Sequence, residues 1–319
     1  MIACVQQGTE AFDARVKGLV QRGADDLRRV ESQVQTILDA VAQEGDVAVK
    51  RFVQQFEGRA LERLTLRAEP WQAQADTVSE PIKASLTWAA ERIRHYHEQQ
   101  RAAQQDFHFT DTDGVALGQR SEPLAAVGVY APGGKARYPS SVLMTAIPAQ
   151  VAGVKRIVLA TPNPTPEVLA AATIAGVHEI LDVGGAQAIA ALAYGTQSIA
   201  PVDKIVGPGN LYVAAAKRLV FGRVDIDSIA GPSEILVVAD DGANPEVIAA
   251  DLLAQAEHDE AAYAWLITLS HAQAKAVMQA LEAQLASLPR ASIARASIEN
   301  HGAIFVVEDR QYACQLSTQ

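Results

Sequence analysis

The first hundred residues carry a helical pattern of apolar positions. Between residues 30 and 41, valine, isoleucine and leucine recur at steps of three and four residues, which places them on one helix face. Gly45 is expected to end this helix and Asp46 to cap the next, which runs to Gly58. A third long helix is predicted to open at Ser79. The N-terminal region is therefore predicted to be helical.

From about residue 123 the pattern changes to short β-branched runs that alternate with alanine-rich helical stretches. This alternation is typical of βαβ units and of a mostly parallel sheet. Capping residues support it, because Thr165-Pro166 and Asn244-Pro245 each precede a helical stretch. The expected strands lie at residues 156–161, 179–183, 204–206, 234–239, 265–269 and 303–307.

Composition narrows the class of protein. The 319 residues suffice for about two domains. The net charge of -10 argues against a nucleic-acid partner, because neutralising phosphates needs a basic face. Cys4 and Cys314 are too few for a disulfide framework, and no apolar stretch is long enough for a membrane span. We therefore expect a cytoplasmic protein that binds a small molecule, with no nucleic acid and no membrane as partner.

Glycine-rich turns mark the candidate binding loops. In a parallel α/β sheet, ligands bind outside the carboxyl ends of the strands, and glycine lets the backbone approach them closely. The free N–H groups of a following helix would favour phosphate or carboxylate, which suits a dinucleotide. No turn has the Gly-x-Gly-x-x-Gly pattern, and each alone could be an ordinary tight turn. The turns are Tyr130-Ala-Pro-Gly-Gly134, Gly184-Gly-Ala-Gln187, Gly207-Pro-Gly-Asn210 and Gly231-Pro-Ser-Glu234.

A possible metal pair lies at the end of the helix expected from Asn244 to Glu257. Gln255 and His258 are three residues apart, so they share a helix face and could reach one ion. Zinc prefers four donors and glutamine is an uncommon ligand, so the same pair can also be read as a polar helix end.

Taken together, these motifs resemble histidinol dehydrogenase. The resemblance rests on Val127–Gly134, Gly184–Thr196, Lys204–Asn210, Ile229–Glu234 and Leu252–His258, in that order, and extends through Glu299–Gly302. It implies an α/β fold, with two Rossmann-like domains of mostly parallel sheets preceded by a helical N-terminal region. The implied parts are an N-terminal helical arm over 1–22, a first α/β domain from 23–122 plus 233–319, and a second α/β domain over 123–232 with the NAD-contacting loops.

The resemblance also implies an activity, which is the oxidation of L-histidinol to L-histidine through L-histidinaldehyde, the last step of histidine biosynthesis. It further implies that NAD accepts the hydrides, that one zinc ion per subunit holds the substrate, and that the protein is a homodimer. Position by position, Tyr130, Gln187 and Asn210 would contact NAD and Ser233 the substrate. Gln255 and His258 would bind both zinc and substrate.

The family pattern continues beyond Gln319. The resemblance implies that the Glu-His acid/base pair and two further zinc ligands lie there, so no catalytic residue is assigned, and a C-terminally truncated member with an incomplete first domain is expected. A catalytically silent module for dinucleotide binding or dimerisation is the alternative. An aldehyde dehydrogenase with a thiol nucleophile is a further one, disfavoured because neither Cys4 nor Cys314 lies in a strand-end loop.

Overall fold

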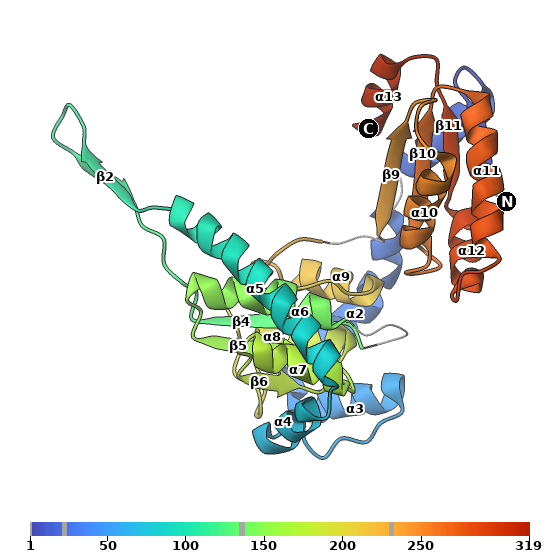
Figure 1. Cartoon of the computed structure of the whole chain (residues 1–319). Helices are drawn as coiled ribbons and strands as arrows, with labels where there is room; N and C mark the ends of the chain where they lie inside the picture. The colour runs from blue at the N-terminus through green and yellow to red at the C-terminus, as the bar shows by residue number, and fades with distance from the viewer. Residues whose placement is uncertain (1, 21–23, 134–137, 230–232) are drawn as a thin grey trace. The chain divides into compact units, whose positions relative to one another are not determined.

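A computed structural model describes residues 2–20, 24–133, 138–229 and 233–319 (Figure 1). Gly134 and the Gly231-Pro232 pair, which belong to two of the expected glycine turns, lie outside the described residues. The chain divides into two compact units. Unit 1 comprises Met1–Asp26 with Gly231–Gln319, and unit 2 comprises Leu27–Ala230.

Unit 2 is built on a five-stranded parallel sheet. Helices connect each strand to the next, and the spatial order is β6-β5-β4-β7-β8. The strands are β4 (Ala126–Tyr130), β5 (Arg156–Ala160), β6 (Glu179–Leu181), β7 (Lys204–Val206) and β8 (Asp225–Ile226). The connecting helices are α6 (Pro139–Ala152), α7 (Pro166–Ile174), α8 (Gly185–Tyr194) and α9 (Leu211–Val220). The predicted βαβ pattern is confirmed here.

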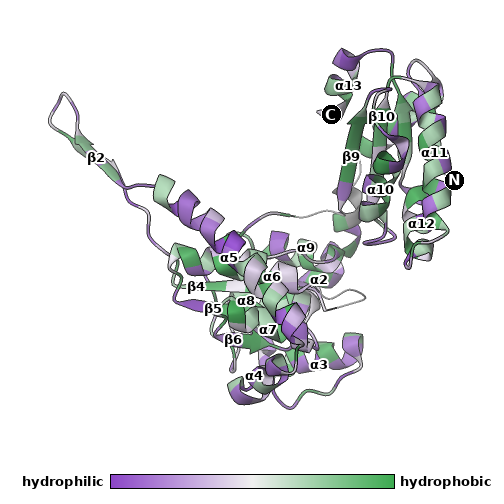
Figure 2. Cartoon of the chain, viewed as in Figure 1, coloured by the Kyte–Doolittle hydropathy of each residue, from purple (hydrophilic) through white to green (hydrophobic). Residues whose placement is uncertain are grey.

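The N-terminal helices cover both faces of this sheet. The helices are α2 (Ala24–Glu44), α3 (Asp46–Glu57), α4 (Ala68–Asp76) and α5 (Glu80–Ala103). The apolar stripe of α2, with Val34 and Val41 fully buried, shares a core with α8 and α9. Trp71 of α4 packs on the opposite face with α6 and α7. Figure 2 shows hydrophobic colour on α8 and on much of the sheet.

This packing corrects the expected domain division. Residues 23–122 were expected to join 233–319, whereas residues 27–122 belong to unit 2 with the strands β4 to β8. The reason is that both faces of a parallel sheet must be covered, and the apolar faces of α2 to α5 supply that cover.

Asp46 begins α3 but does not cap it. The N-cap residue is Gly45, without a side-chain hydrogen bond. The Asp46 carboxylate instead accepts hydrogen bonds from the backbone N–H and the hydroxyl of Ser198, in the turn after α8. Burial raises the pKa of Asp46, but hydrogen bonds from Ser198 and Thr196 outweigh it and hold the pKa below its usual range. The residue expected to cap the helix thus links the start of α3 to the turn after α8.

Replacing Asp46 by asparagine tests this link. A carboxyl whose pKa is lowered by folding stabilises the protein above its unfolded pKa, and this contribution is lost as the pH falls through the folded pKa. Asp46→Asn should therefore lower the free energy of unfolding by about 1 kcal/mol at neutral pH and by less below about pH 4. Urea unfolding at both pH values measures this. The control is Asp39→Asn, which alters an exposed Gln35–Asp39 hydrogen bond. A loss of stability in Asp46→Asn that is equal at both pH values would contradict the explanation.

A β-hairpin follows α5, in a region where no strand was predicted. Strands β2 (Phe107–Thr110) and β3 (Ala116–Gln119) pair antiparallel, and all eight of their residues are exposed. The hairpin extends away from the sheet of unit 2 in Figure 1. His108 lies on the hairpin and is exposed.

Unit 1 contains a second, four-stranded parallel sheet in the order β1-β11-β10-β9. The strands are β1 (Ala3–Gln6), β9 (Glu234–Ala239), β10 (Tyr263–Thr268) and β11 (Ala303–Val306). Helices α10 (Pro245–Ala256), α11 (His271–Leu285) and α12 (Ala291–Asn300) cover one face. Helices α1 (Glu10–Val20) and α13 (Arg310–Ser317) lie over the other, where the rings of Phe12 and Phe305 meet edge to face at 5.6 Å.

This sheet corrects the expectation for the N-terminal arm. Residues 1–22 were expected to be a helical arm, but Ala3–Gln6 is a strand paired in parallel with β11, and only α1 is helical. Four residues are too few to show a periodicity in sequence, and their place depends on the free edge of a strand three hundred residues later. Among the described helices, none combines the length and apolar character needed to cross a bilayer.

Candidate functional site

The strand order of unit 2 reverses between β4 and β7. The chain builds β4, β5 and β6 outward to one edge, then returns to place β7 and β8 on the other side of β4. Open parallel sheets bind ligands outside the carboxyl ends of the strands at such a reversal. Tyr130 ends β4 and Gly207 follows β7, so both lie at this place. The carboxyl ends of β4 and β7 are therefore the candidate binding site of unit 2.

Tyr130 is buried at this edge, with its side chain tied to the next glycine turn. Its hydroxyl oxygen accepts a hydrogen bond of 3.0 Å from the backbone N–H of Gly185. Burial, reinforced by the Glu57 carboxylate, raises the pKa of Tyr130 to about 12. The phenol is therefore neutral at physiological pH, so it can donate its proton in a hydrogen bond and does not act as a base.

The Gly184–Gly185 turn is held by protein groups. The Glu57 carboxylate accepts a hydrogen bond of 3.2 Å from the N–H of Gly184, while Arg59 donates to both Glu57 and Asp182. The N–H groups of Gly184 and Gly185, expected to be free for a phosphate, are therefore bonded within the protein. The physical reason is that Glu57 already places a negative charge at the N-terminus of α8.

Gln187 and Asn210 lie at the starts of two helices, α8 after β6 and α9 after β7. Gln187 is in the first turn of α8 and is 2% exposed. Asn210 is the exposed N-cap of α9, where its side-chain oxygen accepts a 3.1 Å hydrogen bond from the N–H of Val213. Because the cap uses that oxygen, the side-chain NH₂ of Asn210 is the group to contact a ligand. Unit 2 thus gathers Tyr130, Gln187 and Asn210 at the carboxyl edge of one sheet.

The other three candidate residues lie in unit 1. Ser233 is exposed directly before β9, and its carbonyl accepts a 3.0 Å hydrogen bond from the N–H of Tyr263 at the start of β10. His258 is exposed in the turn that leads to β10. Both therefore lie at the amino ends of strands, and not in loops that follow strands of their own sheet.

Gln255 and His258 remain one turn apart. Helix α10 ends at Ala256, and the backbone N–H of His258 donates to the Gln255 carbonyl at 3.2 Å, which continues the turn. Gln255 is half-buried and His258 is exposed. Within the described parts of the chain, no three His, Cys, Asp or Glu side chains gather closely enough to hold a metal ion. The pair offers an amide oxygen and an imidazole nitrogen, which are two of the four donors of a zinc site.

The cysteines lie outside both groups of candidates. Cys4 is on β1 and Cys314 on α13, and partial burial raises the pKa of the Cys4 thiol. A nucleophilic cysteine needs a lowered pKa, so the structure gives no support to the thiol mechanism weighed from the sequence.

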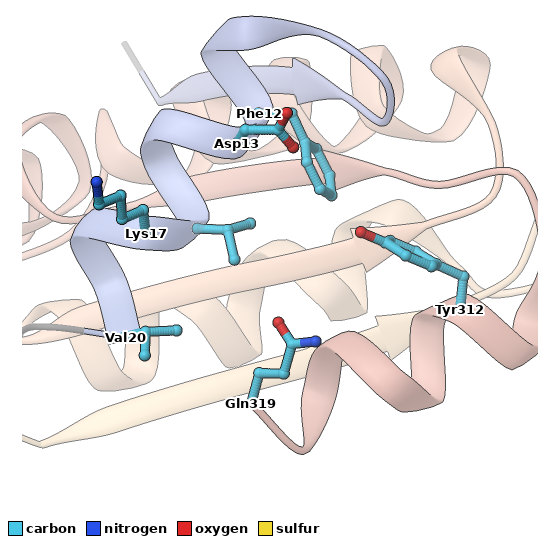
Figure 3. Close-up of a pocket in the computed structure, with 7 residues that line it drawn as sticks. Phe12, Asp13, Lys17, Val20, Tyr312 and Gln319 are labelled. Atoms are coloured by element: carbon cyan, nitrogen blue, oxygen red, sulfur yellow. The ribbon is translucent and has the colours of Figure 1, made fainter.

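An open hollow of about 350 Å³ in unit 1 is also separate from the candidate residues. It lies between α1 and α13, and Figure 3 shows Phe12, Tyr312 and the chain's last residue, Gln319, around it. Asp13 and Lys17 of α1 stand at its rim. None of the six candidate residues lines it.

Two ionic clusters near the reversal were missed by sequence reasoning. One is Glu57, Arg59 and Asp182, and the other is Lys217 with Asp227. A signal existed for Lys217, which follows Val213-Ala-Ala-Ala one helical turn after Val213, on the buried side of α9. A lysine in such a position is unusual and points to a buried partner.

Comparisons with known proteins agree on one family. The histidinol dehydrogenase family model matches residues 20–319. The chain is 51% identical over 312 residues to histidinol dehydrogenase of Syntrophotalea carbinolica, covering 96% of this chain and 72% of that protein. It is 48% identical over 308 residues to histidinol dehydrogenase of Aquifex aeolicus, with the same coverage of each.

A solved structure shows the same fold. Histidinol dehydrogenase from Elizabethkingia anophelis superposes with a TM-score of 0.88 at 34% identity, covering 99% of this chain and 73% of that one. Identity above 30% over more than two thirds of each relative, together with this shared fold, leaves one conclusion. The chain belongs to the histidinol dehydrogenase family of enzymes.

Proposed function

We propose that this protein oxidises L-histidinol to L-histidine through L-histidinaldehyde, with NAD as the hydride acceptor. The observation that carries the proposal is the position of Tyr130 and Asn210 after β4 and β7, at the strand-order reversal of unit 2, where parallel sheets bind dinucleotides. Gln187 lies in the turn of α8 that the Gly185–Tyr130 hydrogen bond ties to this place. Family membership supplies the substrate, since the relatives above are histidinol dehydrogenases.

The three unit 2 residues are assigned to NAD. Tyr130 is a neutral phenol whose hydroxyl accepts a hydrogen bond from the Gly185 N–H, which leaves its proton available to donate to the cofactor. The side-chain amides of Gln187, in the first turn of α8, and of Asn210, at the N-cap of α9, would add polar contacts to the cofactor. Together they would orient the cofactor, which is one of the contributions that a protein makes to hydride transfer.

The unit 1 residues are assigned to the substrate and zinc. Gln255 and His258 would hold the ion, and Ser233 would hydrogen-bond the substrate. Gln255 and His258 would supply two of the four donors that zinc prefers, and the imidazole and amine of histidinol could supply the others. When bound, zinc would fix the small flexible substrate by these two nitrogens.

This donor set predicts that zinc and histidinol bind cooperatively. Each contributes donors that the other needs, so histidinol should raise the affinity for zinc about tenfold, and zinc should raise that for histidinol equally. Competition with a chromophoric chelator, in the presence and absence of histidinol, measures the first effect. Histamine, which keeps the imidazole and amine but lacks the carbinol, should reproduce it, and no coupling with either ligand would contradict shared coordination.

The activity itself is tested with the purified 319-residue chain. NAD binding is measured by calorimetric titration, and NADH formation by absorbance after mixing with histidinol, NAD and zinc. Turnover supports the proposal. NAD binding without turnover would favour the alternative, a dinucleotide-binding module, and failure to bind NAD would overturn the assignment of the unit 2 residues. The homodimer expected from the resemblance stays a prediction, which sedimentation equilibrium tests.

A further inference from the structure

A buried lysine and an aspartate form hydrogen bonds with the carbonyl and the N–H of one residue, Gly207, in the candidate NAD site. Lys217 of α9 has a side chain only 2% exposed, and its ammonium donates to the Gly207 carbonyl at 3.0 Å and to the Asp227 carboxylate. The other oxygen of Asp227 accepts a 2.8 Å hydrogen bond from the Gly207 N–H. The pair therefore satisfies the donor and the acceptor of the residue that follows β7.

Stability alone is a weak explanation for this arrangement. Removing a lysine ammonium from water is costly, and well-packed apolar residues often replace a buried ion pair without loss of stability. What apolar residues cannot do is bind the N–H and the carbonyl of Gly207 at once. The pair instead specifies the orientation of that residue.

The orientation of Gly207 affects the cofactor residues directly. Gly207 has φ +114°, and a Cβ atom at this position would lie 2.1 Å from the backbone oxygen of Tyr130. The backbones after β4 and β7 therefore touch at the reversal of the sheet. Asn210 follows only three residues later, and its capping bond to Val213 continues into the helix that carries Lys217.

We propose that Lys217 and Asp227 are positioning residues for NAD, which fix Gly207 and through it the places of Tyr130 and Asn210. They touch no cofactor atom themselves. The role rests on the proposed function, because it concerns the same cofactor site. It predicts that breaking the pair weakens NAD binding and leaves binding in unit 1 unchanged.

The same sheet offers a matched control. Lys204 and Asp225 pair at 2.6 Å, between the same two strand segments, but at the amino ends of β7 and β8. The chemistry is that of Lys217 and Asp227, while the location is at the opposite edge from the candidate site. Neutralising this pair perturbs the sheet without touching the Gly207 turn.

The experiment compares the double variant Lys217→Met/Asp227→Asn with Lys204→Met/Asp225→Asn. The dissociation constant for NAD should rise about tenfold in the first variant and stay unchanged in the second. A tenfold loss of affinity is typical when the groups that orient direct ligands are removed. Zinc affinity should be unchanged in both. Hydrogen exchange at the amides of Gly207 and Gly209 should accelerate only in the first, with no NAD present.

Several outcomes overturn the inference. Unchanged NAD affinity in the first variant, or an equal loss in both, would show that the pair only stabilises the sheet. If the first variant does not fold, Asp227→Asn decides, since it keeps the shape of the side chain and removes the charge; it should still weaken NAD binding, and an unchanged constant would refute the role. A wild-type chain that binds no NAD would instead refute the proposed cofactor site, and this inference with it.

Discussion

Replacing Gly207 by alanine is expected to destabilise unit 2 by about 3 kcal/mol or more. Two costs combine at this position. The backbone has φ +114°, which L side chains rarely adopt, and the new methyl group would lie 2.1 Å from the carbonyl oxygen of Tyr130. A backbone oxygen at the end of a strand cannot rotate away, so either β4 or the turn after β7 must move. NAD binding should be lost with the displaced Tyr130.

Gly222 provides the control for backbone strain. It lies in the same unit with φ +96°, but no atom lies within 4 Å of the position of its Cβ. Gly222→Ala should therefore cost only the conformational penalty, about 1 kcal/mol. Urea unfolding of the two variants separates the contributions. Equal destabilisation would show that the contact with Tyr130 relaxes at little cost, and would weaken the argument that this turn is fixed.

Replacing His258 by alanine is expected to lower zinc affinity and histidinol oxidation by about a hundredfold or more. His258 supplies the imidazole nitrogen of the proposed pair, and Gln255 alone offers an amide oxygen, a weaker ligand for zinc. The loss of zinc affinity should be large because His258 is one of only two zinc donors that the described pair provides. NAD affinity should not change, since Tyr130, Gln187 and Asn210 belong to unit 2.

A second exposed histidine of unit 1 is the matched control. His271, at the start of α11, pairs with the Gln6 side chain at 3.1 Å and is not among the candidates. His271→Ala should leave both zinc affinity and NADH formation close to wild type. If the two variants bound zinc equally, the assignment of His258 would be incorrect, whatever their effect on turnover.

Local pattern determined much of this protein. The six expected strands from 156–161 to 303–307 are all present, because a run of β-branched residues between helix caps carries its own signal. The glycine turns also pointed to strand ends, which placed Tyr130, Gln187 and Asn210 correctly beside the sheet of unit 2. The motifs further identified the family, which the comparisons confirm.

The tertiary structure alone decided how these parts pair and pack. Contacts between residues far apart in the chain place β1 beside β11 and pack α2 to α5 on the sheet of unit 2. Such contacts also set the reversal of strand order between β4 and β7. The same holds for Glu57 with Gly184 and for Lys217 with Gly207. Periodicity records which face of a segment is buried, but not which segment buries it, since apolar burial is not directional and many partners satisfy it equally.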